Sequence, residues 1–193
     1  MQEPPSVDDG RWAQPLTLEE LGEITAQWLE GSVWTSPWNG ELRPDSETLS
    51  LVPHLAEMNR SGYVTEFSQP GIASAQRAAV AGFCEKDQAE CLASISLESE
   101  LVVLSEYPGV DSTYELPISQ EERRTFTILP GRPMTDVSWG LHPRTLSLLS
   151  DCHYVSIFDP CWGRDDVLWA AVVAALKRDP HECAGSLVDP TTI

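Results

Sequence analysis

Apolar residues recur at helical spacing in several parts of the chain and predict an amphipathic helix in each. A first helix is predicted over about 18–30, because Thr17-Leu18-Glu19-Glu20 forms a capping box and Gly31 can end the helix. A second begins near Leu51, since Pro53 is tolerated only in a first turn. The other predicted helices are 86–95, a segment opened by Pro143, and a last helix over about 164–178 that opens with Asp165 and Asp166.

Alternating, β-branched and aromatic stretches predict the strands. These stretches are 62–67, 101–107, 124–129 and 153–158, with 111–119 as a further edge strand. The apolar stretch 77–84 fits a helix or a strand, and its short length and Gly82 favour a strand. Strands separated by helices predict an α+β or α/β fold, with helices covering a mixed central sheet of about five strands.

The chain of 193 residues fits a single domain. Residues 1–15 are acidic, contain prolines and are expected to form a mobile arm that docks through Trp12. We expect the domain to span 16–180 and a tail to span 181–193. The stretch 33–40 carries two tryptophans among turn-forming residues and is predicted to be a loop whose rings are either buried, which we favour, or form an exposed aromatic surface.

The composition adds a strong charge bias to this picture. Twelve basic residues against 30 acidic ones give a net charge of −18, which argues against nucleic acid or an anionic membrane as partner. No apolar run approaches the roughly 18 residues of a membrane helix, and the first residues lack the basic and apolar regions of a signal peptide. We therefore expect a soluble, cytoplasmic protein.

The five cysteines contain no C-x-x-C pair and are expected to be reduced thiols. Cys84 and Cys152 lie in apolar stretches and are predicted to be small core residues, whereas Cys161 lies in a polar turn and is predicted to be the reactive thiol. No recurrent ligand spacing links the donors His142, Cys152, His153 and Cys161, so we expect no metal and no cofactor.

Two polar loops leave the carboxyl ends of predicted strands, where layered α/β proteins bind ligands. They are 68–77 and 159–166. We expect strands 62–67 and 153–159 to share a sheet that brings both loops to one rim. The candidate ligand-binding residues are Ser68, Gln69, Gln76, Arg77, Asp159, Cys161, Trp162 and Arg164.

Each loop also has a structural interpretation and a catalytic one. In the structural interpretation Gln69 and Arg77 hold a turn, Asp159 caps its loop and Trp162 fills the core. In the catalytic interpretation Cys161 is a nucleophilic thiolate and His153 or His142 is its base. Asp159 then orients that base. Ser68 does not lie in a G-x-S-x-G motif, so no catalytic residue is assigned. On the last helix, the spacing of Trp169 predicts a buried structural ring, which leaves Trp162 as the tryptophan facing a site.

Three groups of motifs resemble a known family. They are Leu18-Glu19-Glu20-Leu21-Gly22 with Trp28-Leu29-Glu30-Gly31, then Leu55-Ala56-Glu57-Met58-Asn59-Arg60-Ser61-Gly62-Tyr63-Val64-Thr65 with Ser68-Gln69-Pro70-Gly71 and Gln76-Arg77-Ala78, and finally Asp159-Pro160-Cys161-Trp162-Gly163-Arg164 with Leu168-Trp169. The chain resembles an uncharacterised family of small acidic proteins of GC-rich Gram-positive (actinobacterial) bacteria. The resemblance implies a shared fold without an established activity.

Two functions stay open on these observations. The first is an acidic binding or regulatory protein, inhibitor- or immunity-like, that engages a partner protein through an acidic, tryptophan-containing surface. The alternative is a small enzyme that acts on a compact ligand in a cleft between Ser68-Gln69-Pro70-Gly71 and Asp159-Pro160-Cys161-Trp162. A deep pocket that contains both loops would favour the enzyme.

Overall fold

The computed structural model describes residues 11–15, 17–36, 43–108, 115–122, 124–130 and 143–184. Predictions for the other residues lie outside this part of the chain. They include most of the arm and of the tail, part of the 33–40 loop, the start of the 111–119 strand, and His142. In the described part of that loop Trp34 is 37% exposed, so the favoured burial of its ring is wrong.

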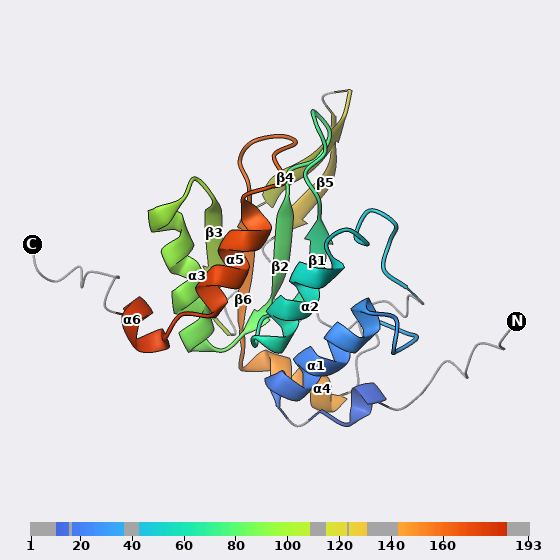
Figure 1. The fold of residues 1–193 in the computed structure, drawn as a ribbon, viewed down its shortest axis with the longest axis vertical. Coiled ribbons are helices and arrows are strands. Elements are labelled where there is room, and N and C mark those ends of the chain that lie inside the picture. Colours follow the sequence, from blue (N-terminus) through green and yellow to red (C-terminus); the bar gives the residue numbers. More distant parts are fainter. Residues whose placement is uncertain are drawn as a thin grey trace, which may run out of the picture.

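The main sheet contains four strands in the order β1-β2-β6-β3 (Figure 1). Their bounds are β1 Val64–Gln69, β2 Ala79–Cys84, β3 Val102–Glu106 and β6 His153–Phe158. A second sheet pairs β4 (Glu115–Glu121) with β5 (Arg124–Pro130). These strands and their covering helices confirm the α+β class.

The main sheet has four strands where about five were predicted, and the prediction that it is mixed is wrong, because every neighbouring pair in it is antiparallel. The last strand in the sequence, β6, inserts between β2 and β3. Each of those two strands pairs antiparallel with β6, so they run in the same direction. The stretch that fitted either a helix or a strand is β2, and all six of its residues are buried.

Helices cover both faces of the main sheet (Figure 1). On one face α2 (Val52–Arg60), α3 (Lys86–Glu98) and α5 (Leu168–Leu176) supply the core residues Leu55, Met58, Leu92 and Trp169. On the other face the first half of α1 (Leu18–Leu29) and α4 (Pro143–Ser150) pack Leu21 and Leu149 against Phe83 and Tyr154. Thr17 caps α1 by accepting a hydrogen bond from the Glu20 backbone N–H, as the capping box predicts.

The short 3₁₀ helix η1 (Arg11–Ala13) docks on the domain through Trp12. The Trp12 Nε1–H donates to the Thr35 carbonyl at 2.9 Å, and the Thr145 hydroxyl donates to the Trp12 carbonyl at 2.8 Å. The expected docking of this ring is therefore confirmed.

The last long helix starts later than predicted. The structure begins α5 at Leu168, so the predicted start near 164 is wrong. Asp165 does not act in a first helical turn, because its Oδ1 accepts hydrogen bonds from the Gly71 N–H at 2.7 Å and the Trp169 Nε1–H at 2.9 Å. These tertiary contacts hold 164–167 as a loop.

The cysteines divide into two groups. Cys91 of α3 and Cys183 of the short helix α6 (Pro180–Ala184) form a disulfide, so the expectation that all five cysteines are reduced is wrong. Their separation of 92 residues leaves no local pattern to reveal the pairing. Cys84 and Cys152 are free and buried, and Cys161 is free and exposed, as predicted. Among the described residues no helix is long and apolar enough to cross a membrane.

Candidate functional site

The carboxyl ends of β1 and β6 lie at the same end of the main sheet, which we call the rim. One row of paired residues runs across the sheet through Gln69, Ala79, Phe158 and Val102. Just beyond this row, the Asp159 N–H donates to the Ala78 carbonyl at 2.9 Å. The expectation that both strands share a sheet and bring their loops to one rim is confirmed.

The two rim loops contact each other directly. The Gly163 N–H donates to the Gln76 carbonyl at 2.9 Å, and the Gly71 N–H donates to Asp165. A Cβ on Gly71 would lie 2.4 Å from the Arg164 carbonyl oxygen, which shows how close the two backbones are. The loops therefore pack on each other at these points instead of facing each other across a gap.

Gln69 is an internal anchor of the rim. Its Nε2–H₂ donates to the carbonyls of Arg77 at 2.9 Å and Ile118 at 3.1 Å, and its Oε1 accepts from the Ser119 hydroxyl at 2.6 Å. The side chain is 4% exposed. These bonds tie β4 to the loop that follows β1, which is the turn-holding role considered from the sequence.

Asp159 is fully buried and organises the second loop. Its Oδ1 accepts from the Cys161 N–H at 2.8 Å, and its Oδ2 accepts from Arg164 Nε at 2.6 Å. Arg164 also donates through Nη1 to Glu100 at 2.7 Å. Hydrogen bonds to Asp159 and then to Glu100 raise the pKa of Arg164 above its usual value. The buried carboxylate is thus paired and hydrogen-bonded, as a buried charge requires.

Arg77 and Trp162 join the loops by a cation–π contact, with the Arg77 Cζ 4.4 Å from the ring centroid. Arg77 also donates through Nη1 to the Pro117 carbonyl at 3.1 Å. Three buried atoms of the loops make no hydrogen bond within the described chain, namely Gln76 Oε1, Arg77 Nε and Arg164 Nη2. Buried polar atoms without a partner are uncommon in folded proteins. The rim is therefore unusual in leaving three such atoms without a hydrogen bond inside the described chain.

The structure separates the residues of the catalytic interpretation. His153 begins β6, whereas Cys161 lies beyond the other end of that strand. The six-residue strand between them is about 17 Å long, so His153 and Cys161 lie at opposite ends of it and His153 is not the base for Cys161. Within the described ranges no group of three or more His, Cys, Asp or Glu residues could hold a metal ion.

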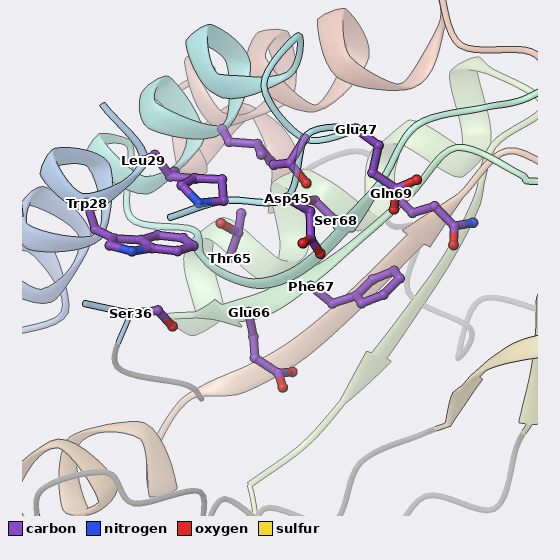
Figure 2. A pocket seen from close by; sticks show the side chains of 13 residues that line it. Trp28, Leu29, Ser36, Asp45, Glu47, Thr65, Glu66, Phe67, Ser68 and Gln69 are labelled. Carbon is purple, nitrogen blue, oxygen red and sulfur yellow. The ribbon is translucent and has the colours of Figure 1, made fainter. Parts of the chain in front are cut away.

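A cavity of about 200 Å³ lies beside β1, which is an edge strand of the main sheet (Figure 2). It includes the candidate residues Ser68 and Gln69, and the end of α1, the segment 44–48 and α2 complete its wall. The lining residues are Trp28, Leu29, Ser36, Pro44, Asp45, Glu47, Thr48, Leu55, Thr65, Glu66, Phe67, Ser68 and Gln69.

The cavity lining is acidic and partly aromatic. Its charged residues are Asp45, Glu47 and Glu66, and no lysine or arginine is among its described lining residues. Glu47 accepts from Gln76 Nε2 at 3.3 Å, which links the cavity to the first rim loop, and Glu66 accepts from the Tyr154 hydroxyl at 2.8 Å. Trp28 and Phe67 supply the rings. Carboxylates beside aromatic rings suit a cationic group.

Sequence reasoning missed most of this cavity. Trp28 belongs to the helical pattern of α1 and gave no separate signal, and 44–48 lies between predicted elements. The position of β1 at the edge of the sheet, which exposes this side of the strand, comes from tertiary strand order alone.

The residues of this chain that match a known family include both the rim and the cavity. Residues 7–179 match the model of a family described as "Domain of unknown function (DUF6919)". The chain belongs to this family, which confirms the predicted membership of an uncharacterised family.

Proposed function

We propose that this member of the DUF6919 family is an acidic binding or regulatory protein that engages a basic segment of a partner protein, as an inhibitor or immunity protein does. The observation that carries the proposal is the cavity beside β1, which combines carboxylates with aromatic rings and has no described basic lining residue.

Charge complementarity supports this partner class. Asp45 and Glu47 are exposed at the cavity, and the whole chain carries a net charge of −18. A field of this sign attracts a basic protein from a distance and repels wrong partners of like charge. For the same reason we propose neither nucleic acid nor an anionic membrane as a partner.

The aromatic residues support an anchoring role. Trp28 is 9% exposed and forms a wall of the cavity, and Phe67 of β1 lines the same cavity as Asp45 (Figure 2). A lysine or arginine side chain that enters such a site gains cation–π attraction in addition to pairing with the carboxylates. Buried aromatic anchors of this kind carry much of the energy of protein interfaces.

The test compares two double variants that remove the same charge. Asp45→Asn/Glu47→Gln alters the cavity, and the control Asp87→Asn/Asp151→Asn alters exposed carboxylates where β2 ends and β6 begins, at the other end of these strands from the rim. We expect the wild type and the control to capture basic proteins from the native lysate at low ionic strength and to release them at high ionic strength. The cavity variant should capture about tenfold less.

Two results would contradict the proposal. The first is capture that does not respond to ionic strength, because an electrostatic interface must weaken when salt screens it. The second is an equal loss in the cavity variant and the control variant, since that would assign the effect to net charge rather than to the cavity.

We also propose a cytoplasmic location for this activity. A disulfide in that compartment is usually transient, catalytic or redox-sensing. The Cys91–Cys183 bond is therefore of separate interest.

A further inference from the structure

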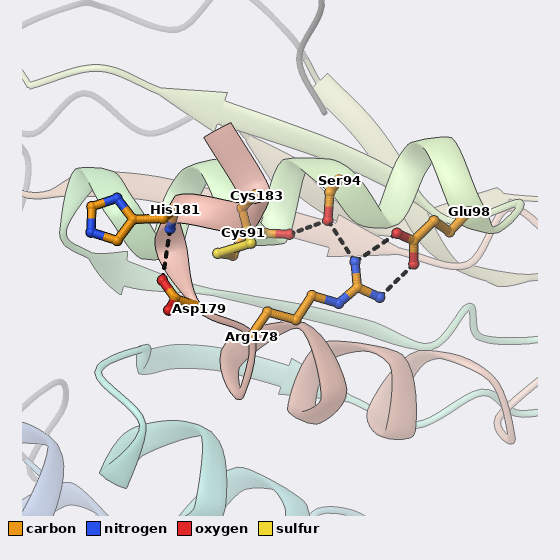
Figure 3. The surroundings of a disulfide bond; sticks show 7 residues. All are labelled: Cys91, Ser94, Glu98, Arg178, Asp179, His181 and Cys183. Atoms are coloured by element: carbon orange, nitrogen blue, oxygen red, sulfur yellow. Dashed lines mark hydrogen bonds and ion pairs between the residues drawn. A yellow bond between two sulfur atoms is a disulfide. The ribbon is translucent and has the colours of Figure 1, made fainter. Parts of the chain in front are cut away.

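The disulfide fastens the short helix α6 to the middle of α3 (Figure 3). Cys91 lies in a helix of 13 residues and is 2% exposed, whereas Cys183 lies in a helix of five residues and is 3% exposed. The family match ends at residue 179, so the bond joins a cysteine within the matched domain to one beyond it.

The other described contacts that hold this segment are polar and partly exposed. Arg178 donates to Glu98 through both terminal nitrogens and to the Ser94 hydroxyl at 3.1 Å (Figure 3). The side chains of Arg178 and Glu98 are 33% and 54% exposed, and an ion pair in such a position contributes little to stability.

Helix α6 has little stability of its own. Within it, the Cys183 N–H donates to the Asp179 carbonyl at 3.3 Å, and the His181 N–H donates to the Asp179 side chain at 2.9 Å. A helix of five residues is far shorter than the length that is stable in isolation. Among the described contacts, the covalent bond is therefore the strongest restraint on the position of this segment.

We propose that Cys91–Cys183 is a reversible thiol-exchange site, at which a dithiol reductant opens the bond and releases α6 from α3. Release uncovers the surface of α3 around Cys91 and Ser94, which are both 2% exposed when the bond is closed. The redox state then decides whether this surface and the C-terminal segment are available to other molecules.

The exchange follows the usual two steps. A thiolate of the dithiol attacks Sγ of Cys183, which fraying of α6 exposes, and forms a mixed disulfide while Cys91 leaves as a thiolate and takes up a proton. The second thiol of the reductant then loses its proton and attacks the mixed disulfide, which releases Cys183 as a thiol. Two electrons pass from the dithiol, which becomes a disulfide, to the protein pair, which becomes two thiols.

Limited digestion with trypsin tests the proposal on the full chain, with dithiothreitol as the reductant. Trypsin cleaves after Lys177 and Arg178, which connect α5 to α6. We expect reduction to raise the cleavage rate at these two bonds at least about fivefold, and reoxidation to restore protection. Cleavage after Arg60 and Arg77, within the fold, should stay slow in both states, which distinguishes local release from global unfolding.

Two variants complete the experiment. Cys91→Ser/Cys183→Ser should be cleaved rapidly with or without reductant, and Cys161→Ser, which changes an exposed free thiol, should respond as the wild type does. If the double variant fails to fold, alkylation of reduced wild type replaces it, and Cys183 should then be labelled faster than buried Cys84.

Three results would overturn the proposal. One is an equal cleavage rate at Lys177 and Arg178 in the oxidised and reduced proteins. Another is slower labelling of Cys183 than of Cys84 after reduction. The third is alkylation of Cys91 and Cys183 in protein that was first treated with oxidised glutathione, because the bond would then not form.

Discussion

The guanidinium of Arg77 lies over the indole ring of Trp162, with 4.4 Å between the Cζ atom and the ring centroid. The first residue belongs to the loop after β1 and the second to the loop after β6. This contact joins two loops whose residues are more than 80 positions apart in the sequence. It gives Trp162 a position at the surface of the rim, whereas Trp169 is 4% exposed within the core.

The two tryptophans should therefore differ in their effect on stability. Trp169→Ala should lower the free energy of unfolding by about 3–5 kcal/mol, because it removes a buried ring and its hydrogen bond to Asp165. Trp162→Ala should cost only about 1–2 kcal/mol, since the ring is half-buried and its contact with Arg77 is partly exposed. Urea denaturation of both variants measures the difference, and a larger loss for Trp162→Ala would show that the roles are reversed.

A methyl group on Gly71 should disturb the joint between the rim loops. Its Cβ would lie 2.4 Å from the Arg164 carbonyl oxygen, and neither atom can rotate away, because the oxygen belongs to the backbone and the Cβ is bonded directly to it. Gly71→Ala should lower the free energy of unfolding by about 1–3 kcal/mol. The control is Gly31→Ala, where the added Cβ meets nothing within 4 Å and the cost is the positive φ of 82° alone. Equal midpoints in urea for the two variants would contradict a tight joint.

The buried His153 should make the protein less stable in mild acid. Burial, and then the positive charge of Lys86, lower its pKa below the ordinary 6.5, and the Glu90 carboxylate opposes this. The unfolded chain binds the proton more readily, so the free energy of unfolding is highest above pH 6.5 and falls as the pH drops toward the pKa of the folded state.

His153→Gln should remove this pH dependence. Between about pH 7.5 and pH 5.5 the wild type should lose up to about 1 kcal/mol more stability than the variant. Thermal melts across this range provide the measurement, with His181→Gln, an exposed histidine, as the control. A wild type and a His153→Gln variant with parallel pH profiles would refute the role of His153.

Cys161 should react with a thiol reagent before the other free cysteines. It is exposed, whereas burial raises the pKa of Cys152 to about 12 and that of Cys84 further still. Only a thiolate attacks an alkylating reagent rapidly, so the two buried thiols should remain unlabelled while the fold is intact. Mass spectrometry of iodoacetamide-treated protein gives the order, and labelling of Cys84 ahead of Cys161 would contradict it.

Local chemistry explains which sequence predictions were accurate. The capping box at Thr17 places the start of α1 correctly, because both of its interacting groups lie within one helical turn. The start of α5 was misplaced for the opposite reason. The carboxylate of Asp165 binds the Gly71 N–H, 94 positions away, and a distant contact of that kind overrides the local preference for acidic residues at a helix start.

The candidate site also combines local features that the sequence predicts with distant contacts that it does not predict. The strand patterns of β1 and β6, and the polar loops after them, predicted a common rim that the register from Gln69 to Phe158 confirms. Which partners the residues of the rim bind could not be predicted. The amide of Gln69, for example, binds the carbonyl of Ile118, 49 positions away.

The sequence by itself determined the elements, the α+β class and the burial of residues such as Trp169, because periods of 2 and 3.6 residues record which side of an element faces the core. Tertiary structure alone decided the insertion of β6 between β2 and β3, the exposure of β1 beside an acidic cavity, and the bond between Cys91 and Cys183. Each of these depends on segments that meet only after the chain has folded, and no spacing along the chain encodes which of several similar strands or thiols will be the neighbour.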